Sequence, residues 1–134
     1  MSQLSTDDRL AIGELLSVYC HHLDYGRWDE FCALFTDDAR LDFGAVMGVH
    51  EGRAGIRGFA DMMQNLGLFM RHYCTNAVIA GEGDRAHARS YVLAVTGQPG
   101  QQSIATGLYE DDLVKVGGRW LLHVRHATID VPAR

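Results

Sequence analysis

The sequence lacks any apolar run that approaches the length of about 18 residues needed for a membrane-spanning helix. Residues 1–8 also lack the basic region, followed by an apolar region, that marks a secretory signal peptide. We therefore expect a cytoplasmic protein that has no membrane partner.

Positive charge is scarce and scattered along the chain. Its 134 residues include 12 lysines and arginines against 17 aspartates and glutamates, which gives a formal net charge of −5. Because no basic residues cluster, we expect no nucleic acid partner. Internal repeats, linkers and low-complexity segments are missing as well. We expect one domain over residues 1–134, long enough to bury about two thirds of the surface of the unfolded chain.

Metal-binding patterns are also missing. Three cysteines share no metal-type spacing, which favours reduced thiols: Cys20, Cys32 and Cys74. His21 and His22 precede Asp24 on a predicted helix, where this spacing does not aim two good ligands at one point. His123 and His126 are three residues apart, so on a strand they point to opposite faces. We expect no metal and no other cofactor, and a metalloenzyme is the least favoured alternative.

Helical periodicity predicts three helices in the first half of the chain. The first begins after a capping residue, Ser5 or Thr6, and carries acidic residues in its first turn. A short second helix is expected over residues 28–35, and a third over residues 53–66. Between them, residues 44–52 read as a glycine-rich loop that could act as a lid.

The remaining segments alternate as strands do. They cover residues 39–43, 68–79, 85–96, 102–116 and 119–129. Glycine-rich breaks separate the last four, so these should form an antiparallel meander. Strands of this length exceed the usual size and should bend. We expect an α+β fold shaped as a cone, with three N-terminal helices packed in a strongly curved, mainly antiparallel sheet.

Two polar residues sit in unusual places. Asp24 ends the first helix, where a carboxylate meets carbonyls unless a donor comes from elsewhere. His72 opens a strand and should share one face with Cys74, Asn76 and Val78. If that face meets the helices, the carboxylate could hold the imidazole in one tautomer and make a general base. Alternatively, Asp24 bonds the turn after its helix and His72 is a half-buried strand histidine.

Strand alternation and composition suggest what surrounds this pair. The same rule groups Tyr91 with Leu93 and Val95, and Tyr109 with Ala105 and Gly107. On the last strand it groups Arg125 with His123 and Ala127, and polar residues on both faces leave the inward face open. The implied wall is apolar: Trp28, Phe35, Phe43, Phe59, Met62 and Met63, beside Tyr19. Such residues line pockets, and they also fill cores.

Four ordered motifs span nearly the whole chain. They are Tyr19-x4-Asp24-x-Gly26-x-Trp28, Arg71-His72-x3-Asn76, Gly107-x-Tyr109-x-Asp111-x-Leu113 and Gly118-Arg119-Trp120-x4-Arg125. As an ordered set they resemble SnoaL-like proteins of the nuclear transport factor 2-like superfamily. The resemblance implies the same α+β cone, usually paired through its sheet, and hence a homodimer.

Within that superfamily, Asp24 and His72 match the dyad of scytalone dehydratase, bile-acid 7α-dehydratases and hexachlorocyclohexane dehydrochlorinase. Tyr19 matches a tyrosine that the bile-acid enzymes use at the same offset. The chain departs from scytalone dehydratase at Leu23, where that enzyme has a tyrosine directly before its aspartate.

The resemblance implies a cofactor-independent lyase or isomerase that acts on a small hydrophobic cyclic or carbonyl compound, such as a steroid, a polyketide or an aromatic-degradation intermediate. His72 would remove a proton from carbon, Asp24 would orient it, and Tyr19 would donate to developing negative charge on oxygen. The expected substrate-binding residues are Trp28, Phe35, Phe43, Phe59, Met63, Asn76, Tyr91, Tyr109 and Arg125.

A second class stays open. The same fold could be a non-catalytic small-molecule-binding or scaffolding module, similar to a dioxygenase β subunit. Its signature would be a cavity filled by Trp28, Phe35 and Met63, with no free volume beside His72.

Overall fold

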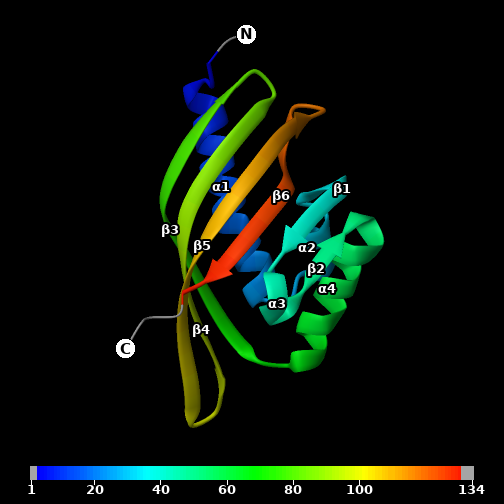
Figure 1. The fold of residues 1–134 in the computed structure, drawn as a ribbon, viewed down its shortest axis with the longest axis vertical. Coiled ribbons are helices and arrows are strands. Elements are labelled where there is room, and N and C mark those ends of the chain that lie inside the picture. The colour runs from blue at the N-terminus through cyan, green and yellow to red at the C-terminus, as the bar shows by residue number, and fades with distance from the viewer. Residues whose placement is uncertain (1–2, 131–134) are drawn as a thin grey trace.

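A curved six-stranded sheet, with helices packed on one side, builds the protein (Figure 1). The computed structural model describes residues 3–130. The helices are α1 (Thr6–Asp24), α2 (Trp28–Cys32), α3 (Gly44–Met47) and α4 (Gly52–Leu66). The strands are β1 (Phe35–Asp42), β2 (Val49–Glu51), β3 (Phe69–Glu82), β4 (Arg85–Gln98), β5 (Gln101–Val116) and β6 (Arg119–Ile129). The predicted α+β class and the mainly antiparallel sheet are confirmed.

The strand order is β2-β1-β6-β5-β4-β3. In residues 3–130 the sheet neighbours are antiparallel except β1 and β6, which run parallel. The helix α1 packs along β3 and β6, and α4 packs against β1 and β2. This arrangement places the C-terminal end of α1 beside the start of β3, where the two predicted dyad residues lie.

The N-terminus of α1 is fixed both locally and by the sheet. The Ser5 hydroxyl accepts from the Asp8 backbone N–H, and the Asp8 carboxylate accepts from the Ser5 N–H, which completes a capping box. The Trp120 indole N–H and the Lys115 ammonium both donate to Asp8 at 3.0 Å. These bonds hold the pKa of Asp8 well below its usual value. They tie the first turn of α1 to the β5–β6 hairpin.

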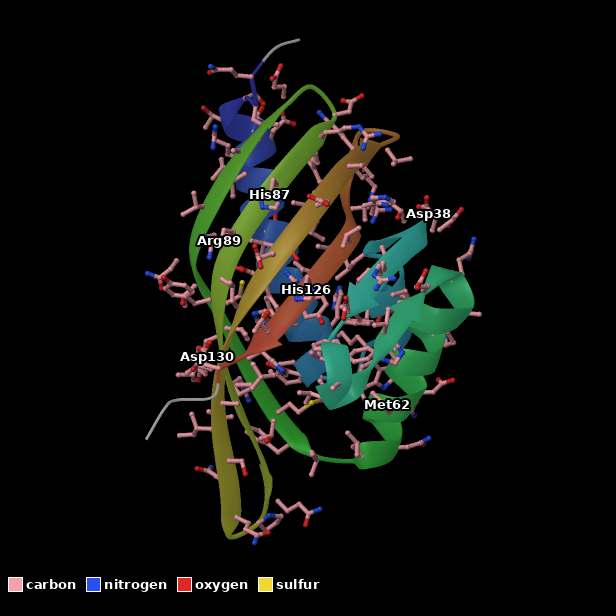
Figure 2. The ribbon with its side chains drawn as sticks, in the orientation of Figure 1. Asp38, Met62, His87, Arg89, His126 and Asp130 are labelled. Atoms are coloured by element: carbon pink, nitrogen blue, oxygen red, sulfur yellow. The ribbon has the colours of Figure 1, made fainter. Side chains whose placement is uncertain are left out.

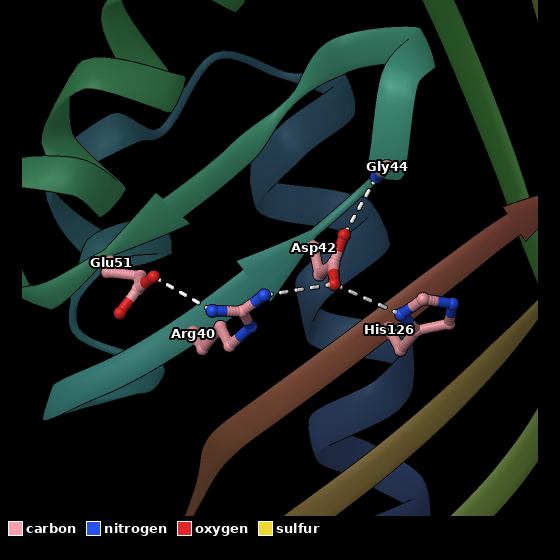
Figure 3. A network of polar contacts seen from close by, with 5 residues as sticks. All are labelled: Arg40, Asp42, Gly44, Glu51 and His126. Atoms are coloured by element: carbon pink, nitrogen blue, oxygen red, sulfur yellow. Dashed lines mark hydrogen bonds and ion pairs between the residues drawn. The ribbon is translucent and has the colours of Figure 1, made fainter.

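A polar network joins β1 to its neighbours (Figure 3). Asp42 accepts from the Gly44 backbone N–H at 2.8 Å, and it also meets Arg40 at 3.4 Å and His126 at 3.3 Å. Arg40 continues to Glu51 on β2 at 2.8 Å. The Gly44 N–H is the largest cause of the lowered pKa of Asp42, ahead of His126 and Arg40. The network links β1, β2, β6 and the start of α3.

Two predicted boundaries are wrong. The second helix ends at Cys32 rather than at residue 35, because Phe35 pairs with Leu122 of β6 and begins β1. Residues 44–52, predicted as a loop, form α3 and β2, because β2 pairs with β1 through Leu41 and His50. The first difference comes from a partner strand that is distant in sequence, and the second from a local strand pair that is too short to show a pattern.

Two bulges change which face the strands present. In β3 the register shifts between Thr75 and Val78, and Asn76 adopts a left-handed φ of 56°. In β6 the register shifts at His123, so that Leu122 and Arg125 are both buried. Alternation read from the sequence fails beyond each of these points.

The hairpin turns follow the predicted glycines. Gly117 and Gly118 both have positive φ values, 57° and 80°, as a two-residue type I′ turn requires. None of the helices in residues 3–130 is both long and apolar enough to cross a lipid bilayer.

Candidate active site

Asp24 and His72 meet at the junction of α1 and β3. The His72 Nδ1 atom lies 2.5 Å from Asp24 Oδ1, and the His72 backbone N–H donates to Asp24 Oδ2 at 2.8 Å. Both side chains are largely enclosed, with 5% of Asp24 and 11% of His72 exposed. The predicted proximity of the two residues is therefore present in the structure.

The two bonds explain why a carboxylate sits at the negative end of a helix. Carbonyls at a helix C-terminus disfavour an anion unless donors come from elsewhere. Here β3 supplies two donors, one from its backbone and one from an imidazole, both belonging to His72. The carboxylate thus joins α1 to β3 while it orients the ring.

The geometry also assigns the tautomer of His72. Because Asp24 is acceptor-only when ionised, the imidazole proton lies on Nδ1, and the Nε2 lone pair is free. Within residues 3–130 no side chain or backbone group bonds Nε2, and this atom is not among the enclosed polar atoms that lack a partner. A neutral imidazole in this state can accept a proton through Nε2.

A second polar cluster is buried deeper under α1. The Arg125 guanidinium forms two bonds of 2.8 Å with the Asp111 carboxylate, and neither side chain is exposed. The guanidinium also lies 4.2 Å from the ring centroid of Tyr19 and 3.9 Å from that of Tyr109. The bidentate pair and the two rings fix the arginine in one orientation.

Two donors of this cluster lack a partner among the described residues. They are the Tyr19 hydroxyl and Arg125 Nη1, both enclosed away from solvent. Burial raises the pKa of Tyr19 to about 12, so the hydroxyl keeps its proton at neutral pH. An unmet buried donor costs about 1–3 kcal/mol, so an oxygen acceptor that reached both groups would be bound favourably. Tyr19 precedes Asp24 on α1 by about 7.5 Å of helix.

The structure brings most of the predicted wall residues together. Four of them are buried in the core: Phe35, Phe43, Phe59 and Met63. Trp28 is partly buried against the same cluster. The rings also contact one another, with centroids 5.2 Å apart for Phe43 and Phe59 and 6.0 Å apart for Trp28 and Phe31.

Tyr109 and Arg125 also face inward, as buried residues on β5 and β6. Two other predicted substrate-binding residues do not. Tyr91 is 58% exposed because its neighbours Ser90 and Val92 take the inward face of β4. Asn76 is exposed because it is the bulge residue of β3. The predicted inward positions of Asn76 and Tyr91 are therefore wrong.

The sequence reading did not single out Asp111 as a site residue. It lies two residues after Tyr109 on β5, so strand alternation places both on the inner face. A carboxylate on an inward face needs a charged partner, and Arg125 is that partner. This spacing is the signal that could have identified it.

Open space lies elsewhere on the surface. A hollow of about 790 Å³ is lined by Gly67, Phe69 and residues 97–102, and another of about 570 Å³ lies near His123. Five hollows stand out in the described part of the chain, and Asp24 and His72 line none of them.

Metal ligands do not converge in the described chain. Residues 3–130 contain no group of three histidine, cysteine, aspartate or glutamate side chains arranged to hold a metal ion. His87 and Asp112 meet as an exposed pair at 3.0 Å. His123 and Asp38 meet as a second pair at 3.3 Å.

Comparisons with known proteins agree with this architecture. Uncharacterized proteins of Mycobacterium tuberculosis and Mycobacterium bovis are 31% identical over 125 residues, which cover 90% of this chain and 84% of theirs. Two solved structures from Novosphingobium aromaticivorans are also similar. One, provisionally named an aromatic ring hydroxylase, is 30% identical with a TM-score of 0.85, covering 97% of this chain and 94% of its own. The other, provisionally named a scytalone dehydratase, is 25% identical with a TM-score of 0.83, covering 95% and 89%.

A family model described as a SnoaL-like domain matches residues 5–126, which include both dyad residues and the buried Asp111 and Arg125. The predicted resemblance is confirmed at the level of the family: the chain belongs to the SnoaL-like domain family.

Proposed function

We propose that this protein is a cofactor-independent lyase or isomerase that removes a carbon-bound proton from a small hydrophobic cyclic or carbonyl compound. The observation that carries the proposal is the pair of hydrogen bonds from His72 to Asp24, one from the backbone N–H and one from Nδ1. This pair leaves Nε2 as an oriented acceptor. The relative provisionally named a scytalone dehydratase supports a dehydratase-like reaction. Steroids, polyketides and intermediates of aromatic degradation are the substrate classes that would offer such a proton in a small hydrophobic compound.

In the proposed reaction, His72 Nε2 takes a proton from a carbon next to a carbonyl group. The electron pair of the broken C–H bond forms an enolate, or expels a leaving group from the neighbouring carbon. The imidazolium that forms is stabilised by the Asp24 carboxylate, which contacts the other ring nitrogen. In an isomerisation the same proton returns to another carbon, and in an elimination it leaves with the departing group.

The buried cluster supplies a second part of the proposed chemistry. Tyr19 and Arg125 each offer an unmet donor, and both are held in place before the substrate arrives. Donors fixed in advance stabilise negative charge on oxygen more than donors that must reorganise. We assign these two donors to the substrate oxygen, with Tyr109 packed beside them. Trp28, Phe35, Phe43, Phe59 and Met63 would form the apolar part of the site.

Solvent deuterium exchange tests the proposal. In D₂O the wild-type protein is expected to exchange the α-hydrogens of at least one ketone in a panel of steroids, aromatic polyketides and monocyclic ketones. The expected rate is roughly 10² to 10⁴ above that in buffer alone, the usual contribution of a positioned base. Mass spectrometry of the recovered ketone measures it. Exchange at the buffer rate across all three classes would contradict the proposed function.

One observation favours a second function, that of a non-catalytic binding or scaffolding module. Phe35 and Met63 are buried in the core, Trp28 packs against them, and the five prominent hollows of the described chain avoid His72. A module of this kind would leave every ketone unexchanged in the same assay, so one experiment separates the two functions.

We further propose that two copies pair through the sheet face opposite α1. Part of this face carries polar and charged side chains, including His87, Arg89 and His126 (Figure 2). Another part carries the outer patch, defined here as Tyr73, Tyr91, Leu93 and Ile104, which are 38% to 70% exposed. Contiguous exposed apolar surface of this kind marks interaction sites.

Leu93→Glu tests the pairing. In a twofold dimer each copy adds a glutamate to the same apolar interface, so the dissociation constant should rise at least about tenfold. Sedimentation equilibrium measures it. Val116→Glu is the matched control, because Val116 is 54% exposed at the far end of β5. Equal effects of the two substitutions, or a monomeric wild type, would refute pairing through the outer patch.

A further inference from the structure

Arg71 is held in a rigid arrangement beside the dyad. Its guanidinium lies 5.5 Å from the ring centroid of Tyr25 and 5.4 Å from that of Phe69. Nη1 is 3.5 Å from the Tyr25 hydroxyl, and Nε is enclosed without a partner. The two rings lie near the guanidinium, and most of its N–H donors have no hydrogen-bond partner among the described residues.

A second arginine shares one of these rings. The Arg27 guanidinium lies 5.7 Å from the Tyr25 centroid. Tyr25 directly follows Asp24 in the chain, Arg27 comes two residues later, and Arg71 directly precedes His72. Two positive groups therefore gather around one exposed ring at the dyad.

These two arginines have no carboxylate. Among residues 3–130, neither Arg27 nor Arg71 forms an ion pair, whereas Arg40, Arg53 and Arg57 each have an acidic partner. Four other described arginines also form no ion pair, but none of them lies against an aromatic ring as Arg27 and Arg71 do: Arg9, Arg85, Arg89 and Arg119. The two arginines are unpaired although the formal net charge of the chain is −5, so that acidic residues outnumber basic ones.

Arg125 shows what a completed arrangement of this type looks like. It also lies between two aromatic rings, those of Tyr19 and Tyr109, and Asp111 fills its fork with two bonds. Arg71 also lies near two rings, at 5.5 and 5.4 Å, but these rings are exposed and no carboxylate of residues 3–130 bonds its guanidinium. Its N–H donors are therefore free to bond an acceptor from outside the chain.

The helix dipole gives only part of the explanation. Positive side chains are favoured near the C-terminal end of α1, which accounts for arginines in this region. A dipole does not require a guanidinium to be fixed between two rings. A fixed planar fork is suited to bidentate recognition of carboxylate or phosphate oxygens.

Space for a ligand is available next to this site. Phe69, which stacks on Arg71, also lines the hollow of about 790 Å³ between the start of β3 and the β4–β5 turn. This volume lies in the range of small-molecule sites, about 300 to 1,000 Å³.

We propose that Arg71, assisted by Arg27, binds a carboxylate or phosphate group carried by a small-molecule ligand. In combination with the proposed function, on which this step rests, the substrate class narrows to hydrophobic carbonyl compounds that also bear an anionic group. The anion would lie on the outside of the β3 edge, and the reacting carbon would lie against His72.

A titration with inorganic phosphate tests the anion site alone. The Nε–H resonance of Arg71 is a suitable probe, because this proton is enclosed and exchanges slowly with solvent. Phosphate is expected to shift the Arg71 and Arg27 side-chain resonances more than that of Arg89, an exposed arginine of β4 that also forms no ion pair but has no aromatic ring against it. Sodium chloride at matched ionic strength is the reference. Equal shifts at all three arginines would overturn the site.

A pair of probes with the same shape separates a free anion from an anionic ligand. Wild-type protein is expected to bind 2-naphthoate about tenfold more tightly than 2-naphthamide, the change that one charge-assisted contact gives. Arg71→Gln should remove this preference, Arg71→Lys should keep part of it, and Arg89→Gln should leave it unchanged. Isothermal titration calorimetry measures the four proteins.

The outcomes are distinct. Phosphate could shift the Arg71 resonance while the wild-type protein binds 2-naphthoate no more tightly than 2-naphthamide, or binds neither. This result would overturn the proposal that the anionic group is carried by a small-molecule ligand, and the site would then bind a free anion. If Arg89→Gln abolishes the preference as Arg71→Gln does, general attraction explains it and the site is refuted. His72→Gln should retain the preference, so loss of the proposed catalysis and loss of the anion site are told apart.

Discussion

Replacing His72 by glutamine is expected to lower the rate of solvent deuterium exchange roughly 10²- to 10⁴-fold. Glutamine has a similar length and can still donate from its amide to Asp24. It cannot accept a proton from carbon, because its amide is not basic. The quantities to measure are kcat for exchange and the dissociation constant of the ketone, and only the first should change strongly.

The fold should survive this substitution. Asp24 Oδ2 accepts from the backbone N–H of residue 72, a donor that every residue except proline keeps. The melting temperature of His72→Gln should therefore stay close to that of wild type. His126→Gln is the matched control, since His126 is exposed on the opposite face of the sheet. Exchange at the wild-type rate in His72→Gln would exclude this residue as the base.

Replacing Asp24 by asparagine is expected to cost a comparable factor for a different reason. The backbone N–H of His72 needs an acceptor, so the asparagine carbonyl should take the place of Oδ2. Its NH₂ group then faces His72 Nδ1, which must become the acceptor. The imidazole proton moves to Nε2, and the nitrogen that should take the substrate proton is blocked.

The tautomer itself is the decisive measurement for Asp24→Asn. Nitrogen-15 NMR of the imidazole distinguishes Nδ1–H from Nε2–H, and we expect the first in wild type and the second in the variant. Asp112→Asn is the control, because Asp112 contacts His87 at 3.0 Å on the exposed face of the sheet. A variant that kept both the Nδ1–H tautomer and the wild-type exchange rate would show that Asp24 is structural only.

The long elements could be predicted because each carries its own signal. The capping residue Ser5 marks α1, and the glycine pair Gly117 and Gly118 marks the last hairpin. The short elements α3 and β2 could not be predicted, since a four-residue helix and a three-residue strand contain too little periodicity. The strand β2 exists because it pairs with β1, and α3 begins where the Gly44 N–H donates to Asp42.

The two misplaced site residues have different causes. Strand alternation gave the correct inward face for His72 and Cys74, which precede the bulge of β3. It failed at Asn76, the bulge residue. For Tyr91 the grouping with Leu93 was correct, but the sequence contained no signal for which face met the helices. A polar residue such as Ser90 on the buried face conceals the apolar side of β4.

The contact between Asp24 and His72 could be predicted because a carboxylate is unfavourable at the C-terminal end of α1. A carboxylate at a helix C-terminus requires a donor, and the ordered family motifs supplied one in His72. No comparable contradiction marked Arg71, since exposed arginines are common. Its significance depends on Tyr25 and Phe69, which come together only in the folded chain.

Asp24 both orients the imidazole and attaches β3 to α1, and these two roles constrain how relatives can change at this position. One carboxylate oxygen serves the imidazole and the other serves the main chain of β3. A descendant that lost its histidine would still need Asp24 to attach β3 to α1, whereas a descendant that lost the aspartate would lose this attachment as well as the orientation of the imidazole. Under the proposed function, non-catalytic relatives should therefore retain the aspartate more often than the histidine.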